Sequence, residues 1–312
     1  MPQAQANGIQ IEYETFGKAT DPAILLVMGL GGQLVLWPEA LCEALARGGF
    51  YVIRYDNRDV GLSSKIESAG KPDLTRAGLR YMLRLPIKAG YGLDDMAADA
   101  IGLLDALKIR RAHVVGLSMG GMIGQILAAQ HAERVSSFTA IMTTSGNPWL
   151  PQPSFKLRMR LTRRPKHTSR ESLVQHSMNT WKLIGSPGYP TDDATLRAMV
   201  ERDQKRSLYP RGIARQTLAI MASKSRLPLL KRIAAPTLVI HGEADPLVPV
   251  AAGRELGRLI PGARLEIIPG MGHDLPAPLL PRIGKLILDH VQAVEGGASA
   301  ASTEKAQAAA RA

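Results

Sequence analysis

This chain of 312 residues has one cysteine, few aromatic residues and no long hydrophobic run, and each scarcity argues against a structural feature or a kind of partner. The single cysteine, Cys42, cannot form an internal disulfide, and its place in a helical pattern favours a small buried hydrophobic residue. No apolar run is long enough to cross a membrane. Residues 1–7 lack the charged and apolar parts of a secretory signal, so we expect a cytoplasmic protein. The hydrophobic content of 45% still suffices for a real core.

Acidic residues are scarce in one segment only. The chain has a formal charge of +12, and residues 147–232 contain 18 Lys and Arg against 5 Asp and Glu, a local balance of +13. This segment is either the solvated face of ordinary helices or a surface that attracts anionic lipid or acidic substrates. No nucleic-acid motif accompanies the charge and aromatic residues make up only 4%, which argues against a nucleic-acid partner.

What the chain does have is a regular alternation of strand and helix patterns, which predicts βαβ units and a mostly parallel sheet. The expected strands are Ile9–Glu14, Ala23–Val27, Tyr51–Tyr55, Ala112–Leu117, Val135–Met142, Pro236–Ile240 and Arg264–Ile268. The expected helices are Pro38–Ala46, Asp94–Leu107, Met119–Gln130, Ser172–Leu183, Thr191–Lys205, Val250–Leu259 and Leu279–Val294.

The alternation stops in the basic segment, where no convincing buried strand is found. We therefore expect residues 1–146 and 233–295 to form the core and residues 147–232 to form a basic helical cap over the C-terminal edge of the sheet. Residues 296–312 are rich in Ala, Ser and Gly with few hydrophobic residues, so we expect a disordered tail.

Residues 116–120 read Gly-Leu-Ser-Met-Gly and lie between a predicted strand and a predicted helix. This is the G-x-S-x-G pattern of a nucleophile elbow in its expected context, and it makes Ser118 the candidate nucleophile. A serine at a strained turn needs neighbours without bulk, which Gly116 and Gly120 provide. The pentapeptide alone is a weak signal, because Gly and Ser are common.

Two later loops strengthen the assignment of Ser118 as the nucleophile. Asp245 follows the predicted strand that ends at Ile240, and His273 follows the next strand, in a loop with two glycines. A serine hydroxyl becomes a good nucleophile when an imidazole takes its proton and an acid holds that imidazole in the right tautomer. All three residues lie just beyond strand C-termini, where open α/β sheets bind ligands. Taken alone, His273 reads as a loop histidine and Asp245 as a turn former.

Several other polar residues invite catalytic roles that fit them less well. Glu243 and Asp274 are rival acids, but the first lies close to its strand and the second is adjacent to His273. We interpret Arg58, beside a tight glycine turn, as a residue that pins its loop through paired hydrogen bonds, and Asp56 as structural too. His113 and His241, which belong to strands, are interpreted as packing residues.

Acyl transfer also needs donors for the oxyanion that develops on the substrate carbonyl. The backbone N–H of Met119, at the start of a helix, is one candidate. The second is the N–H of Leu30, in the glycine-rich loop after the strand ending at Val27, with Gly31 as the alternative. Trp37 either lines the acyl pocket or starts the core of the following helix.

Three stretches give the chain a resemblance to a known family. Residues 27–29 read Val-Met-Gly where many relatives have His-Gly, residues 55–63 read Tyr-Asp-Asn-Arg-Asp-Val-Gly-Leu-Ser, and residues 116–121 contain the elbow. With the His-Gly-x-x-Asp stretch ending at Asp245, they make the chain resemble the α/β-hydrolase fold, most closely bacterial esterases of the aclacinomycin methylesterase type. The resemblance implies a mostly parallel sheet flanked by helices, with a helical cap inserted after the sixth strand.

The resemblance also implies a hydrolase that cleaves a carboxylic ester through an acyl-enzyme, without a cofactor or metal. Its triad would be Ser118, His273 and Asp245. The same constellation supports carbon–carbon bond hydrolysis, perhydrolysis, or hydrolysis of a lipid ester at a membrane reached through the basic cap. A non-catalytic receptor is a further class, although such proteins usually lose a triad residue. Epoxide and haloalkane hydrolysis are disfavoured because their nucleophile is a carboxylate. The expected partner is a small-molecule ester, and the oligomeric state stays open.

Overall fold

The computed structural model describes residues 1–161, 167 and 169–309. Its centre is a sheet of eight strands in the order β1-β2-β4-β3-β5-β6-β7-β8. The pairs β1–β2 and β2–β4 are antiparallel and the remaining pairs are parallel, so the expected α/β class with a mostly parallel sheet is confirmed. The strands are β1 (Gln3–Ala6), β2 (Ile9–Phe16), β3 (Ala23–Val27), β4 (Tyr51–Tyr55), β5 (Ala112–Leu117), β6 (Val135–Ile141), β7 (Thr237–Gly242) and β8 (Arg264–Ile268).

Helices cover both faces of this sheet. They are α1 (Glu39–Arg47), α2 (Leu74–Met82), α3 (Leu93–Ala106), α4 (Met119–Gln130), α5 (Phe155–Leu161), α6 (Arg170–Ile184), α7 (Asp193–Arg206), α8 (Pro210–Ala222), α9 (Leu227–Leu230), α10 (Ala251–Leu259) and α11 (Leu280–Ala309). Single 3₁₀ turns lie at Leu34–Leu36, Glu67–Ala69, Ala132–Arg134 and Ala277–Leu279. In the described part of the chain, no helix is long and apolar enough to span a bilayer.

The core consists of two clusters, one on each face of the sheet. On β3, Leu25 and Val27 pack with α3, α4 and α10, while Ile24 and Leu26 pack with α1 and α11. Successive side chains of a strand point to opposite faces, so a strand covered on both sides must be apolar throughout. That is why β3 reads as one continuous hydrophobic run. Cys42 of α1 is fully buried in this core, as expected, and burial raises the pKa of its thiol to about 12.

The sequence pattern missed several elements. Strand β1 has only four residues, Gln-Ala-Gln-Ala, whose alternation contains no large apolar side chain. Helices α2, α5, α8 and α9 were missed as well. Helix α9 contributes Leu230 to the core cluster, although it lies in the segment expected to be a cap. The segment 147–232 contains helices and no strand in its described residues, and its exact boundaries stay a prediction.

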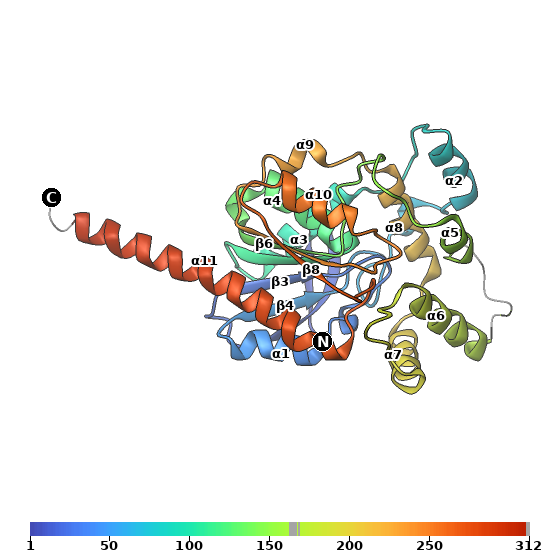
Figure 1. The fold of residues 1–312 in the computed structure, drawn as a ribbon, viewed down its shortest axis with the longest axis horizontal. Coiled ribbons are helices and arrows are strands. Elements are labelled where there is room, and N and C mark those ends of the chain that lie inside the picture. The colour runs from blue at the N-terminus through green and yellow to red at the C-terminus, as the bar shows by residue number, and fades with distance from the viewer. Residues whose placement is uncertain (162–166, 168, 310–312) are drawn as a thin grey trace.

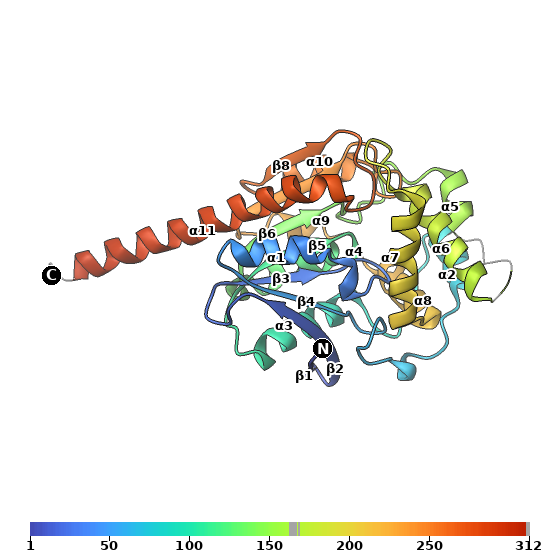
Figure 2. The same ribbon diagram turned by 90° about the horizontal axis from the view of Figure 1, so that it is seen from below.

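Helices α5 to α8 gather at one end of the sheet, and α11 extends from the opposite end (Figures 1 and 2). The backbone of α11 is helical as far as Ala309, and in both views its last turns project beyond the rest of the molecule. Residues 310–312 of the tail lie outside the described part. The disorder expected for residues 296–312 therefore stays a prediction.

Candidate active site

The candidate nucleophile lies at the turn between β5 and α4. Ser118 has φ 55° and ψ −116°, a strained backbone conformation for a residue with a side chain. The turn has no room for side chains beside it. A Cβ on Gly116 would lie 2.3 Å from the Gly120 carbonyl oxygen, and one on Gly120 would lie 1.9 Å from the Val27 oxygen. The glycines of the G-x-S-x-G pattern are therefore required by the close approach of α4 to β3 and β5.

The structure brings Ser118, His273 and Asp245 into direct contact. The His273 Nε2 atom lies 3.0 Å from Ser118 Oγ, and the Nδ1 atom lies 2.7 Å from Asp245 Oδ2. An ionised carboxylate only accepts hydrogen bonds, so Nδ1 carries a proton and Nε2 is left free to accept the serine proton. Asp245 is held in place by two backbone N–H groups, of Leu247 and Val248, each 2.8 Å from Oδ1.

Neither rival acid contacts the His273 ring. The Asp274 carboxylate accepts a hydrogen bond from Ser186 Oγ, and burial raises the pKa of this carboxyl above its ordinary value. Glu243 is exposed. His241 is buried behind the Asp245 loop, with Nε2 2.8 Å from the Val248 carbonyl oxygen, and burial lowers its pKa.

His113 is buried as well. Its ring lies between Ser137 Oγ, 2.8 Å away, and Glu295 Oε1, 3.0 Å away, and burial lowers its pKa to about 4. Both His113 and His241 therefore sit in packed surroundings, as their interpretation from the sequence required. No group of three or more His, Cys, Asp or Glu side chains that could hold a metal ion is found in the part of the chain that the structure describes.

The backbone N–H groups of Met119, in the elbow, and of Leu30, in the loop after β3, donate to no acceptor among the described residues. The alternative donor, the Gly31 N–H, already donates to Gln216 Oε1 at 2.8 Å. The loop that carries Leu30 lies against the elbow, because a Cβ on Gly29 would be 3.2 Å from Ser118 Cβ. The N–H groups of Met119 and Leu30 are therefore free to donate to a ligand, whereas that of Gly31 is not.

A cavity of about 680 Å³ opens between the core and the cap beside His273. Of the two expectations for Trp37, a place in the pocket wall is wrong and a place in the core beside the following helix is confirmed, because Trp37 is fully buried in the core cluster on the α1 side. The tryptophan that does line the pocket is Trp181 of α6, a position that helical periodicity alone does not distinguish. The wall also contains the apolar side chains of Met28, Val35, Leu36, Leu117, Leu183, Leu196, Met199 and Leu275.

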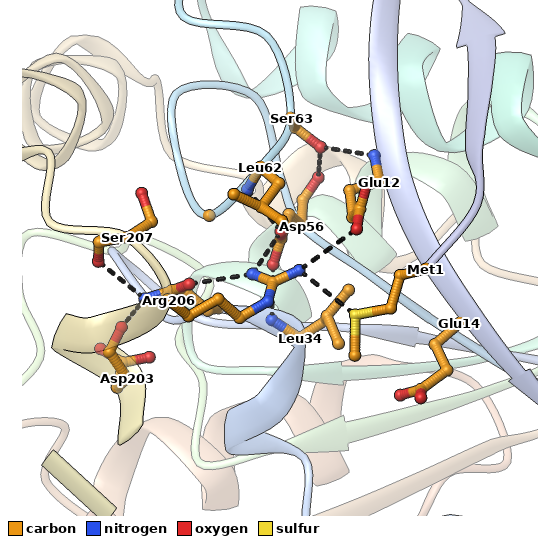
Figure 3. A network of polar contacts seen from close by, with 12 residues as sticks. Met1, Glu12, Glu14, Leu34, Asp56, Leu62, Ser63, Asp203, Arg206 and Ser207 are labelled. Atoms are coloured by element: carbon orange, nitrogen blue, oxygen red, sulfur yellow. Dashed lines mark hydrogen bonds and ion pairs between the residues drawn. The ribbon is translucent and has the colours of Figure 1, made fainter. Parts of the chain in front are cut away.

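The Tyr55–Ser63 stretch, which was notable in the sequence, connects the cap to the core. The carboxylate of Asp56 is fully buried and accepts from the Leu34 N–H at 2.7 Å, the Leu62 N–H at 2.8 Å and Arg206 Nη1 at 2.6 Å. Figure 3 shows the Arg206 guanidinium, from the end of α7, pointing at Asp56 and Glu12. Asp56 thus holds a cap helix and the loop after β3 together, which is a structural role.

Asp59 holds another cap helix, α8, to the core. Its two carboxylate oxygens accept from Nε and Nη2 of Arg215, each at 2.9 Å. Arg58 instead pairs with Asp99 through two hydrogen bonds of 2.6 Å, as expected of a residue that pins its loop. Arg226 is also buried, and desolvation lowers its pKa to about 10. Part of the positive charge counted in residues 147–232 is therefore internal and does not face solvent.

A second contact joins the cap to the loop that carries His273. Ser186, just after α6, accepts from the Gly272 N–H at 2.8 Å and donates to the Asp274 carboxylate. The His273 N–H donates to the Ile184 carbonyl at 2.7 Å. Sequence reasoning missed Ser186, because it lies in a Pro- and Gly-rich break that reads only as a turn. These hydrogen bonds fix the backbone on both sides of the imidazole.

We expect Ser186→Ala to lower kcat about tenfold with little change in KM, because a small displacement of a proton-transfer group slows chemistry more than binding. The variant leaves the Gly272 N–H unpaired and frees Asp274. Steady-state kinetics on a good ester substrate would measure the effect. Ser186→Thr, which keeps the hydroxyl, should recover most of the rate. An unchanged kcat in Ser186→Ala would show that the hydrogen bonds of Ser186 to Gly272 and Asp274 do not position His273.

Comparisons with known proteins agree with this architecture. Residues 22–276 match the model of a family described as alpha/beta hydrolase fold. The chain is 32% identical over 306 residues to rhodomycin D methylesterase from Streptomyces sp. (strain C5), covering 90% of this chain and 94% of that protein. It is 31% identical to rhodomycin D methylesterase from Streptomyces peucetius, with the same shares covered. Among solved structures, the enol-lactonase from Burkholderia xenovorans LB400 superposes with a TM-score of 0.69 at 27% identity, covering 93% of this chain and 100% of that one.

Proposed function

The chain belongs to the α/β-hydrolase fold family and is a carboxylic-ester hydrolase, and from this premise we propose that Ser118, His273 and Asp245 are its catalytic triad. The proposal is carried by one observation: the imidazole of His273 lies within hydrogen-bond distance of both Ser118 and Asp245. In this proposal the N–H groups of Met119 and Leu30 form the oxyanion hole.

The geometry supports a two-step reaction. His273 Nε2 takes the Ser118 proton while Oγ attacks the ester carbonyl, and the oxyanion is stabilised by the two backbone donors. The imidazolium, compensated by Asp245, then gives its proton to the departing alcohol, leaving an acyl-enzyme. A water molecule, deprotonated by His273, attacks the acyl carbon and releases the acid. No step needs a cofactor.

We further propose that the substrate is the methyl ester of a large, mostly apolar carboxylic acid. A cavity of about 680 Å³ is large enough for a molecule of some twenty or more heavy atoms, and its wall is largely apolar. The two relatives of about 30% identity are named as methylesterases of rhodomycin D. The acid part would then occupy the cavity between Trp181 and Leu117, and methanol would leave.

A panel of esters tests this proposal. Methyl esters of bulky aromatic acids are expected to show kcat/KM at least about 100-fold above methyl acetate, because apolar area buried outside the reacting centre lowers the transition-state energy. Released methanol and acid would be measured, with p-nitrophenyl esters of increasing acyl length as a second series. A preference for the smallest acids in both series would contradict the substrate class while leaving the esterase activity intact.

The same panel tests the alternative chemistries. A carbon–carbon bond hydrolase would cleave β-diketone-like compounds and show negligible turnover of simple esters. A perhydrolase would form peracid when hydrogen peroxide is added. Faster cleavage of a β-diketone than of every ester would overturn the ester proposal.

The contact with anionic membranes expected of residues 147–232, and a cytoplasmic location, also remain proposals. Arg206, Arg215 and Arg226 of that segment are engaged inside the protein, as described above. A membrane surface must therefore be sought among the bases that face outward.

A further inference from the structure

Helix α2 has an amphipathic sequence, yet its apolar side is exposed. Of its residues only Ala77 is buried, whereas Leu79 and Met82 are 58% and 73% exposed. An amphipathic surface helix normally turns its apolar stripe toward the core. Leu83 and Leu85, just after α2, continue the exposed apolar surface and are 59% and 45% exposed.

A second exposed apolar segment lies beside it. Trp149 and Phe155 are 77% and 76% exposed. The Arg84 guanidinium stacks over the Trp149 ring, 5.0 Å from its centroid, and so joins the two segments. Among the described residues, nine of the fourteen exposed large hydrophobic side chains belong to these segments. They are Leu74, Leu79, Tyr81, Met82, Leu83, Leu85, Trp149, Phe155 and Met159. We call residues 74–88 and 149–161 the α2–α5 surface.

The charge of the α2–α5 surface has one sign. Its two segments contain seven basic residues and no Asp or Glu. None of the seven forms an ion pair with an acid in the part of the chain that the structure describes, unlike Arg206 and Arg215. They are Arg76, Arg80, Arg84, Lys88, Lys156, Arg158 and Arg160. A cavity of about 520 Å³ beside α2 is lined by the bases Lys71, Arg76, Arg80 and Lys88 and by one acid, Asp73, which adds a mainly cationic recess to the same surface.

This combination favours one kind of partner. A second copy of the chain in a two-fold dimer would set seven bases against seven bases, and charged residues are depleted at the centres of protein interfaces. Exposed aliphatic side chains gain nothing from a nucleic-acid backbone. Apolar side chains interleaved with bases are typical of segments that lie in the interface of an anionic bilayer, where the former enter the acyl boundary and the latter meet phosphates.

We propose that the α2–α5 surface docks the protein on anionic lipid bilayers. Helices α2 and α5 lie at the same end of the molecule as the cap helices α6 to α8, and opposite the free end of α11 (Figures 1 and 2). Docking therefore brings the cap side of the enzyme to the membrane. The surface contains none of Ser118, Asp245 and His273, so its test is independent of the proposed catalytic function.

Vesicle co-sedimentation tests the proposal on the full chain. We expect binding to phosphatidylcholine vesicles that contain about 30 mol% phosphatidylglycerol in about 0.1 M NaCl, little binding to phosphatidylcholine alone, and release in about 0.5 M NaCl. Trp149 provides a second readout, because its fluorescence should shift to the blue when its ring enters the lipid interface. The shift should be absent in Trp149→Phe.

Two matched triple variants locate the surface. Arg76→Gln, Lys88→Gln and Lys156→Gln together should weaken binding to the anionic vesicles about 100-fold, since each base near such a surface contributes roughly fivefold. The control, Lys224→Gln, Lys231→Gln and Arg232→Gln, removes the same charge outside the surface and should weaken binding by less than about fivefold if only the general field is affected. Both variants should keep the activity of the parent on a water-soluble ester.

The proposal fails if the anionic vesicles do not sediment the protein, or if the two triple variants weaken binding equally. It also fails if the protein is a stable dimer that Met82→Glu converts to a monomer, because the apolar surface would then be covered by a second copy. Light scattering coupled to size-exclusion chromatography measures that outcome directly.

Discussion

Ser118→Ala is expected to lower kcat/KM for the preferred ester by about 10⁴- to 10⁶-fold, because the proposed acyl-enzyme forms on Ser118 Oγ. Binding of the substrate should be nearly unchanged, since the oxyanion donors and the cavity remain. The residual rate would come from those groups alone. Initial rates at high enzyme concentration, with the thermal unfolding midpoint as a check on folding, would measure the loss.

A serine-directed organophosphate provides an independent measurement of the same residue. The parent protein should gain the mass of one phosphoryl adduct in intact-mass spectra, and Ser118→Ala should gain none. Ser68→Ala, at an exposed serine, is the matched control and should keep both activity and labelling. If Ser118→Ala retains turnover within tenfold of the parent, the nucleophile is wrong, and a receptor without catalysis would show no turnover in the parent either.

Asp245→Asn is the second large effect, and we expect it to lower kcat by about 10³- to 10⁴-fold. The carboxylate accepts the Nδ1–H of His273 at 2.7 Å and compensates the charge that the imidazole gains. An asparagine can present its NH₂ group to Nδ1, which forces the proton onto Nε2. In that tautomer the imidazole cannot accept the Ser118 proton.

Asp274→Asn is the matched control for this variant. It makes the same chemical change at the adjacent acid, and the asparagine oxygen can still accept from Ser186 Oγ, so we expect less than a tenfold loss. Comparing kcat of the two variants on one ester separates the two acids. Equal losses would mean that the histidine is oriented by both carboxylates, and a larger loss for Asp274→Asn would overturn the assignment of Asp245.

Much of the fold could be predicted from the sequence, because a buried parallel strand is recognisable from a short run of consecutive apolar residues. Seven of the eight strands were expected, and each is an apolar run or an alternation that contains large apolar side chains, whereas β1 alternates only Gln with Ala over four residues. The long periodic helices were expected too. The missed helices α2, α5 and α9 have nine residues or fewer, and α2 has the apolar stripe but no core to face. Helix α8 is longer, but its buried face includes the polar residues Arg215 and Gln216.

In the candidate site, too, one part could be predicted from the sequence and another could not. Ser118, Asp245 and His273 stand at strand ends, and parallel strands of one sheet bring their C-terminal ends to one edge, so local pattern and chain order suffice to expect their meeting. The pocket is different. Trp37 and Trp181 look alike along the chain, and only the packing of α1 on the sheet and of the cap over it decides which of them meets the cavity.

The sequence by itself determined the class of fold, the strained serine turn and the order of the three residues that converge on it, because these depend on backbone geometry within a few residues and on a sheet that orders its own strands. Tertiary structure alone decided how the charge and the apolar surface are used. Arg206 and Arg215 form ion pairs with the buried carboxylates of Asp56 and Asp59, while the bases and hydrophobic residues of the α2–α5 surface face outward. Composition counts charges and apolar residues, but whether each is paired, buried or exposed depends on contacts between segments far apart in the chain.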